Sequence, residues 1–232
     1  MLDIVANNNW KRPIYFTGGS FGDDDYMWMK DFLQLDGMVY KLVPVRTALE
    51  KAASPLDMGQ IDSDKMYDIV MKWDWGNGES PNIYHDPETR KNSITYRTNL
   101  ARLMEQLINE GKTEKAKKVI DLAIEKMPLE YYGFYTMLEP FAAGYYEVKE
   151  TAKARKILSQ LMVKYQENLK YYSNLKSNEQ VDVYLEIITD IERYRDLLLV
   201  MKERGDMEFY NTNKATFNSY NKMFSRFKRD NE

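Results

Sequence analysis

The sequence contains no cysteine among its 232 residues. Without thiols, the chain cannot form disulfides, thiolate zinc sites or a cysteine nucleophile. It has one histidine, His85, in the loop sequence NIYHDP. A single histidine excludes a histidine-based zinc cluster, and we interpret His85 as a loop residue. The lack of cysteine fits a location outside the bacterial cytoplasm without requiring one.

Long apolar runs and a strong excess of one charge are also lacking. The longest candidate run, RDLLLVM, falls far short of the roughly 20 residues that span a bilayer. The first ten residues, MLDIVANNNW, have neither the basic nor the apolar region of a signal peptide. They resemble the last turns of a helix, so we expect this chain to be a piece of a longer protein. The net charge of −3 gives no general argument for nucleic acid, and we expect no nucleic-acid partner.

Motifs for catalysis and cofactors are missing as well. The sequence has no G-x-S-x-G, no Walker A motif and no G-x-G-x-x-G. GGSFG follows a predicted strand but lacks the lysine of a phosphate-binding loop, and the three aspartates 23–25 at its exit would repel phosphate. These aspartates are candidates for calcium, but the alternating spacing of an EF-hand is absent, so we interpret them as a solvated acidic loop. We therefore expect no metal and no cofactor.

The most regular part of the chain is 97–128, which predicts one complete helical hairpin. Apolar residues recur at the i, i+3, i+4, i+7 spacing of an amphipathic helix in its first half. They are Leu100, Leu103, Met104, Leu107 and Ile108, followed in the second half by Ala116, Val119, Ile120, Ala123 and Ile124. The order of large, small and proline positions resembles the 34-residue tetratricopeptide pattern, although Leu103-Met104 stands where that pattern has Leu-Gly.

Residues at the ends of these two helices predict where each one stops. Gly111 can adopt the left-handed conformation that ends the first helix, and Thr113 is the predicted cap of the second. Pro128 ends the hairpin because proline cannot continue a helix.

The same pattern returns later in the chain. A second hairpin is predicted to start near Tyr135, with an apolar face at Leu138, Phe141, Ala142 and Tyr145 and, in its second helix, Ala154, Leu158 and Leu161. A third, looser pair follows, with Gly205-Asp206 as its turn and a last helix through Phe217, Tyr220 and Phe224. Together these hairpins predict a short helical array.

Residues 1–60 lack the helical periodicity of the rest of the chain. A short helix at the start is predicted to break at the asparagines 7–9, and β-favouring runs around Tyr15 and at 38–45 predict two strands. Asp36-Gly37 fits either a hairpin turn or the end of a short helix. From Ser63 a helix is predicted, with Asp62 or Ser63 as its cap, and 75–89 is predicted to be a loop. The predicted fold is thus mainly α: a tetratricopeptide-like hairpin array at 61–232 with a small α/β segment at 1–60.

Two sequence blocks, LDIVANNNWKRPIYFTGG and DYMWMKDFLQLDGMVYKLVP, resemble a known family. They are similar to the region after the membrane spans in a bacterial family of large polytopic proteins of uncharacterised function. The membrane part of that family is similar to protein O-mannosyltransferases and other C-type glycosyltransferases that use lipid-linked sugars. The resemblance continues through Met66-Tyr67-Asp68 and the hairpin at 97–128. The catalytic acids of such transferases lie in the membrane part, so the resemblance assigns no catalytic residue to this chain.

This resemblance implies a non-catalytic, soluble C-terminal domain on the periplasmic face of the inner membrane, joined to the membrane only through an upstream part. Its expected role is to bind a protein or peptide partner, or a glycan acceptor, on the first helix of each hairpin. The candidate contact residues are Asn99, Arg102, Gln106 and Tyr135.

Two alternatives remain open. The chain is rich in aromatic residues, with 18 Tyr, 9 Phe and 4 Trp, which fits helix packing but also suits a glycan-binding module. Its candidate stacking residues are Trp28, Trp73, Trp75 and Tyr84. The other alternative, a self-contained hydrolase, requires two carboxylates in one pocket, and nothing among the 36 acidic residues marks out such a pair.

Overall fold

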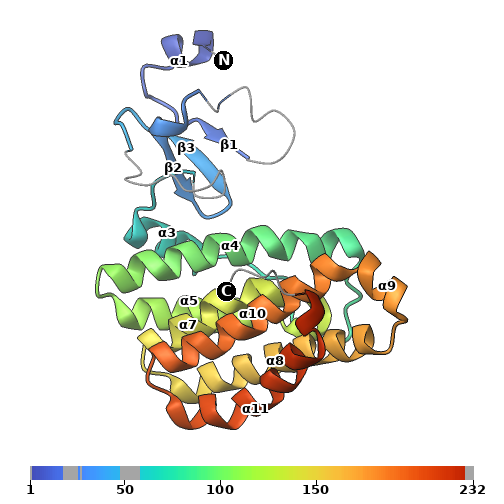
Figure 1. The fold of residues 1–232 in the computed structure, drawn as a ribbon. Coiled ribbons are helices and arrows are strands. Elements are labelled where there is room, and N and C mark those ends of the chain that lie inside the picture. The colour runs from blue at the N-terminus through green and yellow to red at the C-terminus, as the bar shows by residue number, and fades with distance from the viewer. Residues whose placement is uncertain (1, 18–25, 27, 48–57, 228–232) are drawn as a thin grey trace. The chain divides into compact units, whose positions relative to one another are not determined.

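The structure, a computed structural model, describes residues 2–17, 26, 28–47 and 58–227 (Figure 1). It is mainly helical (69%), with a small three-stranded antiparallel sheet near the N-terminus. This confirms the predicted fold class in its coarse form. The chain divides into two compact units, Met1–Gly133 and Phe134–Glu232. The predicted domain boundary at residue 60, between the N-terminal segment and the helical array, stays a prediction.

The N-terminal segment consists of a short helix and the sheet. α1 (Leu2–Asn8) ends before Asn9 and Trp10, which both have positive φ. The strands β1 (Tyr15–Phe16), β2 (Leu33–Asp36) and β3 (Val39–Leu42) lie in the order β1-β3-β2, all antiparallel. Asp36 pairs with Val39, and Gly37 has a φ of +72° in the turn between them. Asp36-Gly37 therefore forms a hairpin turn and does not end a short helix.

A small apolar core lies against this sheet. The ring of Phe16 stacks on that of Tyr26 with centroids 4.7 Å apart, just ahead of the 3₁₀ turn η1 (Lys30–Phe32). The buried members of this core are Phe16, Tyr26, Met29, Leu33, Leu42 and Met58.

The helices of the first unit are α3 (Ser63–Val70), α4 (Pro87–Asn109), α5 (Thr113–Lys126) and α6 (Leu129–Tyr132). α4 and α5 pack side by side as a hairpin (Figure 1). Their predicted apolar faces are buried except for Ile108 and Ile124, which are half-buried, and Gly111 has a φ of +73° between the helices, as expected. Asp62 caps α3 by accepting a hydrogen bond from the Lys65 N–H.

Two helix starts differ from the sequence prediction. α4 begins at Pro87 rather than Arg97, because the Asp86 carboxylate accepts hydrogen bonds from the Glu88 and Thr89 N–H groups and proline fits the first helical position. The predicted loop 75–89 therefore ends at Asp86. The prediction of Thr113 as a cap is wrong: Thr113 is already the first helical residue of α5, and Lys112 precedes it without a side-chain cap.

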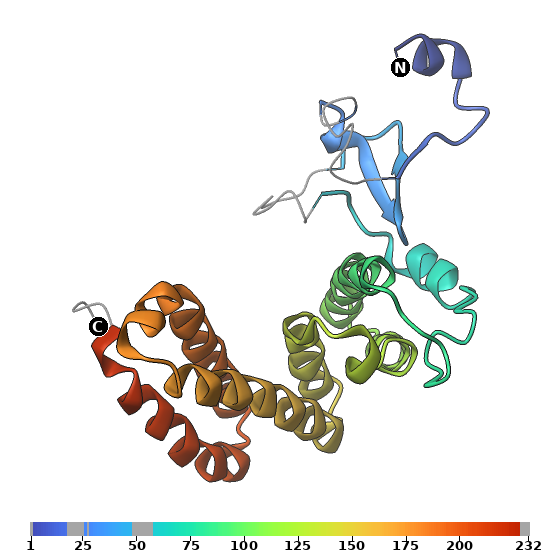
Figure 2. The same ribbon diagram turned by 90° about the vertical axis from the view of Figure 1, so that its right-hand side faces the viewer.

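The described residues of the second unit form helices joined by short turns. It contains η3 (Tyr135–Leu138), α7 (Glu139–Glu147), α8 (Thr151–Ser173), α9 (Ser177–Asp182), α10 (Tyr184–Glu203), α11 (Met207–Met223) and η4 (Ser225–Phe227). α7 packs on α8, and α10 contacts both α8 and α11 (Figure 2). The predicted face Leu138, Phe141, Ala142 and Tyr145 is buried. Helical hairpin packing is thus present, whereas the assignment of the hairpins as tetratricopeptide repeats stays a prediction.

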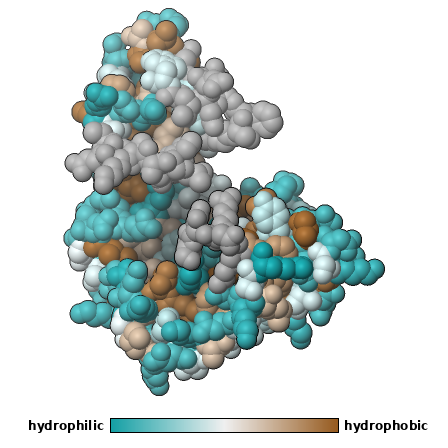
Figure 3. All heavy atoms as spheres, viewed as in Figure 1, coloured by the Kyte–Doolittle hydropathy of each residue, from teal (hydrophilic) through white to brown (hydrophobic). Residues whose placement is uncertain are grey.

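On the face drawn in Figure 3, hydrophilic side chains dominate the helices and apolar ones are scattered among them. Within the described ranges, no helix combines the length and the apolar character that a bilayer-spanning helix needs.

Candidate functional site

A surface cleft of about 380 Å³ lies in the first unit, where the loop before α4 meets α6. Its walls come from the loop, the first turn of α4 and the start of α6. The lining residues are Pro81, Asn82, Ile83, Tyr84, His85, Arg90, Glu130 and Tyr131. Because the loop and α6 are far apart in the sequence, only the folding of the α4–α5 hairpin brings them together.

The loop side of the cleft is held by His85, which is buried. Its Nε2 lies 2.9 Å from the Gly78 carbonyl oxygen, and its ring packs against that of Tyr132 with centroids 4.5 Å apart. Arg90 Nε donates to the His85 carbonyl oxygen at 2.9 Å. The loop is therefore tied to both α4 and α6, and His85 has a structural role that its loop sequence alone did not reveal.

Asp86 fixes the point at which this loop becomes α4. Hydrogen bonds from the Thr89 hydroxyl and from the N–H groups of Thr89 and Glu88 lower the pKa of Asp86. The carboxylate therefore stays ionised at neutral pH, where it also stabilises the positive end of the helix. The Asp86 cap thus fixes the first turn of α4, which carries Arg90 into the wall of the cleft.

The side chains at the cleft surface are a mixture of apolar and polar groups. Tyr84 is 80% exposed, and Ile83 beside it is also exposed. Arg90, Asn82 and Glu130 are exposed too. Among the described residues, the Nη atoms of Arg90 and the carboxylate of Glu130 form no ion pair or hydrogen bond. These polar groups are available to a ligand, and a hydrolase would need a second carboxylate beside Glu130, which the lining does not supply.

The structure does not bring the four candidate stacking residues together. Trp28 is 59% exposed but belongs to the N-terminal segment, and Tyr84 lies in the cleft. Trp73 and Trp75 contact each other edge to face, with centroids 5.6 Å apart, and both pack on Tyr96 of α4. The Trp75 indole Nε1 is buried without a hydrogen-bond partner among the described residues. Trp73 and Trp75 are thus half-buried in an aromatic cluster, whereas Trp28 and Tyr84 are exposed. The stacking role of all four stays a prediction.

Two of the candidate contact residues on α4 bind the chain's own N-terminal segment. Asn99 is buried and donates to the Gly37 carbonyl oxygen at 2.9 Å. Arg102 donates to the carbonyl oxygens of Met58 and Gly59 at 3.0 and 2.8 Å. A partner that used Asn99 or Arg102 would compete with these bonds. Their role in partner binding stays a prediction.

The other two contact candidates lie in separate units. Gln106, half-buried, donates to Glu110 at 2.6 Å. Tyr135, also half-buried, accepts from the Asn168 amide, which donates to the buried Asp190 as well, both at 2.9 Å. Burial raises the pKa of Asp190. Tyr135 is therefore part of a polar chain that joins η3, α8 and α10.

The metal and phosphate candidates of the sequence cannot be placed. GGSFG and the three aspartates 23–25 lie outside the described residues. Within the described ranges, no group of three or more metal-ligating side chains comes together. The expected absence of a metal stays a prediction.

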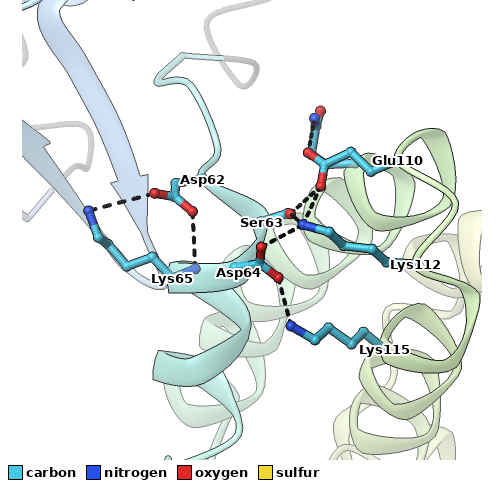
Figure 4. A network of polar contacts seen from close by, with 8 residues as sticks. Asp62, Ser63, Asp64, Lys65, Glu110, Lys112 and Lys115 are labelled. Atoms are coloured by element: carbon cyan, nitrogen blue, oxygen red, sulfur yellow. Dashed lines mark hydrogen bonds and ion pairs between the residues drawn. The ribbon is translucent and has the colours of Figure 1, made fainter.

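A network of charges joins α3 to the α4–α5 turn (Figure 4). Lys112 Nζ lies 2.7 Å from both the Asp64 and the Glu110 carboxylate, and Lys115 Nζ lies 2.6 Å from Asp64. The Ser63 hydroxyl donates to Glu110. Hydrogen bonds led by that from Lys112 lower the pKa of Asp64 to about 2 and that of Glu110 to about 2.

This network predicts a specific loss of stability in acid. Because the pKa of each carboxylate is lower in the folded chain than its ordinary value of 3.8 or 4.5, folding favours the ionised form. The stabilisation is present above these ordinary values and is lost as the pH falls towards 2. We expect Lys112→Met to lower the thermal midpoint at pH 7 and to match the unaltered chain near pH 2, measured by circular dichroism. A midpoint difference that stays constant across this range would contradict the prediction.

Comparison with known proteins gives one family match. Residues 1–65 match the family model described as TMEM260-associated domain 2, and TMEM260 is a membrane protein O-mannosyltransferase-like family. No curated protein matches the chain. No solved structure matches it either. The resemblance inferred from the sequence is thus confirmed in coarse form for the N-terminal segment, while its extension through Met66–Asp68 and the hairpin stays a prediction.

Proposed function

We propose that this chain is a non-catalytic, acceptor-binding domain of a membrane glycosyltransferase-like protein. The observation that carries the proposal is the match of residues 1–65 to TMEM260-associated domain 2. A domain that accompanies such a protein and holds a helical hairpin is suited to binding a protein, peptide or glycan acceptor. In this proposal it lies on the periplasmic face of the inner membrane, and the parent's membrane part carries out the transfer.

Contacts inside the first unit support this proposal. Asn99 and Arg102 of α4 bind carbonyl oxygens at 37, 58 and 59, all of which belong to the matched segment. The ion pairs of Asp64 with Lys112 in the α4–α5 turn and with Lys115 of α5 add a link to the end of that segment. In this chain the α4–α5 hairpin is therefore fastened to the family-matched residues.

The parent protein can be tested by immunoblotting native cell fractions with an antibody raised against this chain. The proposal expects a band well above the mass of 232 residues, confined to the membrane fraction. A soluble band at the mass of this chain alone would overturn it. The chain would then be a free helical adaptor.

The acceptor-binding role is tested with the same parent in membranes that contain a lipid-linked sugar donor. Gln106→Ala and Tyr135→Ala are made as separate variants, because the two residues belong to different units. Each is expected to reduce sugar transfer to protein while leaving donor binding unchanged. Lys91→Ala is the matched control, because Lys91 is exposed on α4 and, among the residues that the structure describes, pairs only with Glu88 on the helix surface. A variant that transfers sugar as well as Lys91→Ala does would show that its residue takes no part in acceptor binding.

A carbohydrate-binding role is the second candidate, and one observation favours it. Tyr84, one of the four stacking candidates, is 80% exposed on the wall of a cleft that also carries polar side chains. Titration of glycans into the chain, followed by calorimetry, tests this role. Absence of heat with every glycan would count against it.

A further inference from the structure

We propose that the cleft between the loop 81–85 and α6 binds a neutral sugar ring of a glycan, with Tyr84 as its stacking surface. This inference deepens the carbohydrate-binding role and rests on it, whereas the acceptor-binding proposal can stand without it. It adds three residues that the sequence did not single out: Arg90, Glu130 and Tyr131, all of which line the cleft.

The size and walls of the cleft suit one or two sugar rings. Its volume of about 380 Å³ lies within the range of about 300–1,000 Å³ typical of small-molecule sites. A pyranose presents one face of C–H groups, which packs on an aromatic ring such as that of Tyr84. Pro81 and Ile83 extend this apolar surface.

The loop is already fixed in place, which lowers the cost of binding. His85 is held by the Gly78 carbonyl oxygen and the Tyr132 ring, and Arg90 holds the His85 carbonyl oxygen. A ligand therefore meets a largely preformed wall and need not order the backbone beneath Tyr84.

The polar groups select for a neutral ligand that is rich in hydroxyls. Arg90 offers N–H donors, Glu130 offers acceptors, and Asn82 offers both. A sugar hydroxyl both donates and accepts hydrogen bonds, so Arg90, Glu130 and Asn82 together can form hydrogen bonds with neighbouring hydroxyls of one sugar. The opposite charges of Arg90 and Glu130 largely cancel for any charged ligand, so such a ligand would lose hydration without a net attraction to offset it. The lining thus favours a neutral hexose over a uronic acid, an amino sugar or a phosphate.

The test is calorimetric titration of the full chain with four neutral disaccharides: maltose, cellobiose, lactose and mannobiose. At least one is expected to bind, and Tyr84→Ala is expected to weaken that binding by about tenfold, which corresponds to about 1.4 kcal/mol for the lost ring contact. Tyr84→Phe keeps the ring and should bind almost as the unaltered chain does. Tyr171→Ala is the matched control, because Tyr171 is an exposed tyrosine on α8 outside the cleft.

Charge selection is tested with glucuronic acid and glucosamine. Both should bind more weakly than glucose, and Glu130→Gln should strengthen binding of glucuronic acid relative to glucose. Binding that survives Tyr84→Ala but is lost in Trp28→Ala would overturn the cleft as the site and leave the carbohydrate-binding role intact. Absence of binding by the unaltered chain to every sugar would overturn both.

Discussion

Replacing Arg97 by alanine is expected to lower the free energy of unfolding of the first unit by about 3–5 kcal/mol. Arg97 lies in α4 with its whole side chain buried. Its Nη1 donates to the Gly133 carbonyl oxygen at 2.6 Å and its Nη2 to the Met127 carbonyl oxygen at 2.7 Å. Because the side chain is removed from water, the pKa of the guanidinium is lowered to about 10. Alanine would leave both carbonyls without this donor and open a void beside them.

The two carbonyls lie just after α5 and at the end of α6, so Arg97 joins α4 to the segment that closes the hairpin. Arg97→Lys is expected to cost less, because an ammonium can still reach one carbonyl. Lys91→Ala on the same helix should change stability by no more than about 0.5 kcal/mol, since its pair with Glu88 is exposed.

Urea unfolding followed by tryptophan fluorescence measures this effect, because all four tryptophans belong to the first unit. Arg97→Ala and Lys91→Ala should differ clearly in their urea midpoints. Equal midpoints for the two variants would mean that the carbonyls find other donors or water when the guanidinium is removed.

The helices were predictable because their signals are local. The apolar stripe of the hairpin at 97–128, the positive φ at Gly111 and Gly205, and the end before Pro128 all follow from short-range patterns. The start of α4 at Pro87 was also readable from Asp86-Pro87, but the repeat pattern placed the boundary at Arg97. Thr113 shows the limit of such signals: a residue that can cap a helix can equally well be its first helical residue.

The candidate site was less predictable because it depends on contacts between distant segments. The packing of the hairpin brings Tyr84 and Tyr131 into one cleft. The spacing of these residues in the sequence does not predict that they lie close together. Arg97 is a further case, because a charged residue in an amphipathic helix is normally expected to face water. Asn99 and Arg102 were expected on an open face, but their donors bind carbonyls of the N-terminal segment, whose position over α4 could not be read from the sequence.

The second unit has its own central ion pair, formed by Asp206 and Arg155. The Asp206 side chain is only 5% exposed and precedes α11. Arg155 of α8 binds it with two hydrogen bonds of 2.8 and 2.6 Å, and the Tyr146 hydroxyl of α7 adds a third of 2.7 Å. Chiefly because of the hydrogen bonds from Arg155, the pKa of Asp206 is lowered, so the carboxylate is ionised at neutral pH.

Asp206→Ala is therefore expected to lower the free energy of unfolding of the second unit by about 2–4 kcal/mol. The lower half of this range is favoured because Arg155 is partly exposed and can regain water. Far-ultraviolet circular dichroism during urea unfolding should show the loss, while the tryptophan fluorescence transition of the first unit stays in place.

A double-mutant cycle separates the ion pair from the other contacts of each residue. If the pair itself stabilises the fold, Arg155→Ala in the Asp206→Ala background should cost less than in the unaltered chain, by about 1.5–3 kcal/mol. Tyr146→Phe provides the control for the third hydrogen bond and should cost about 1 kcal/mol. Additivity of the two alanine changes to within about 0.5 kcal/mol would show that Asp206 stabilises the start of α11 by itself rather than by tying it to α8.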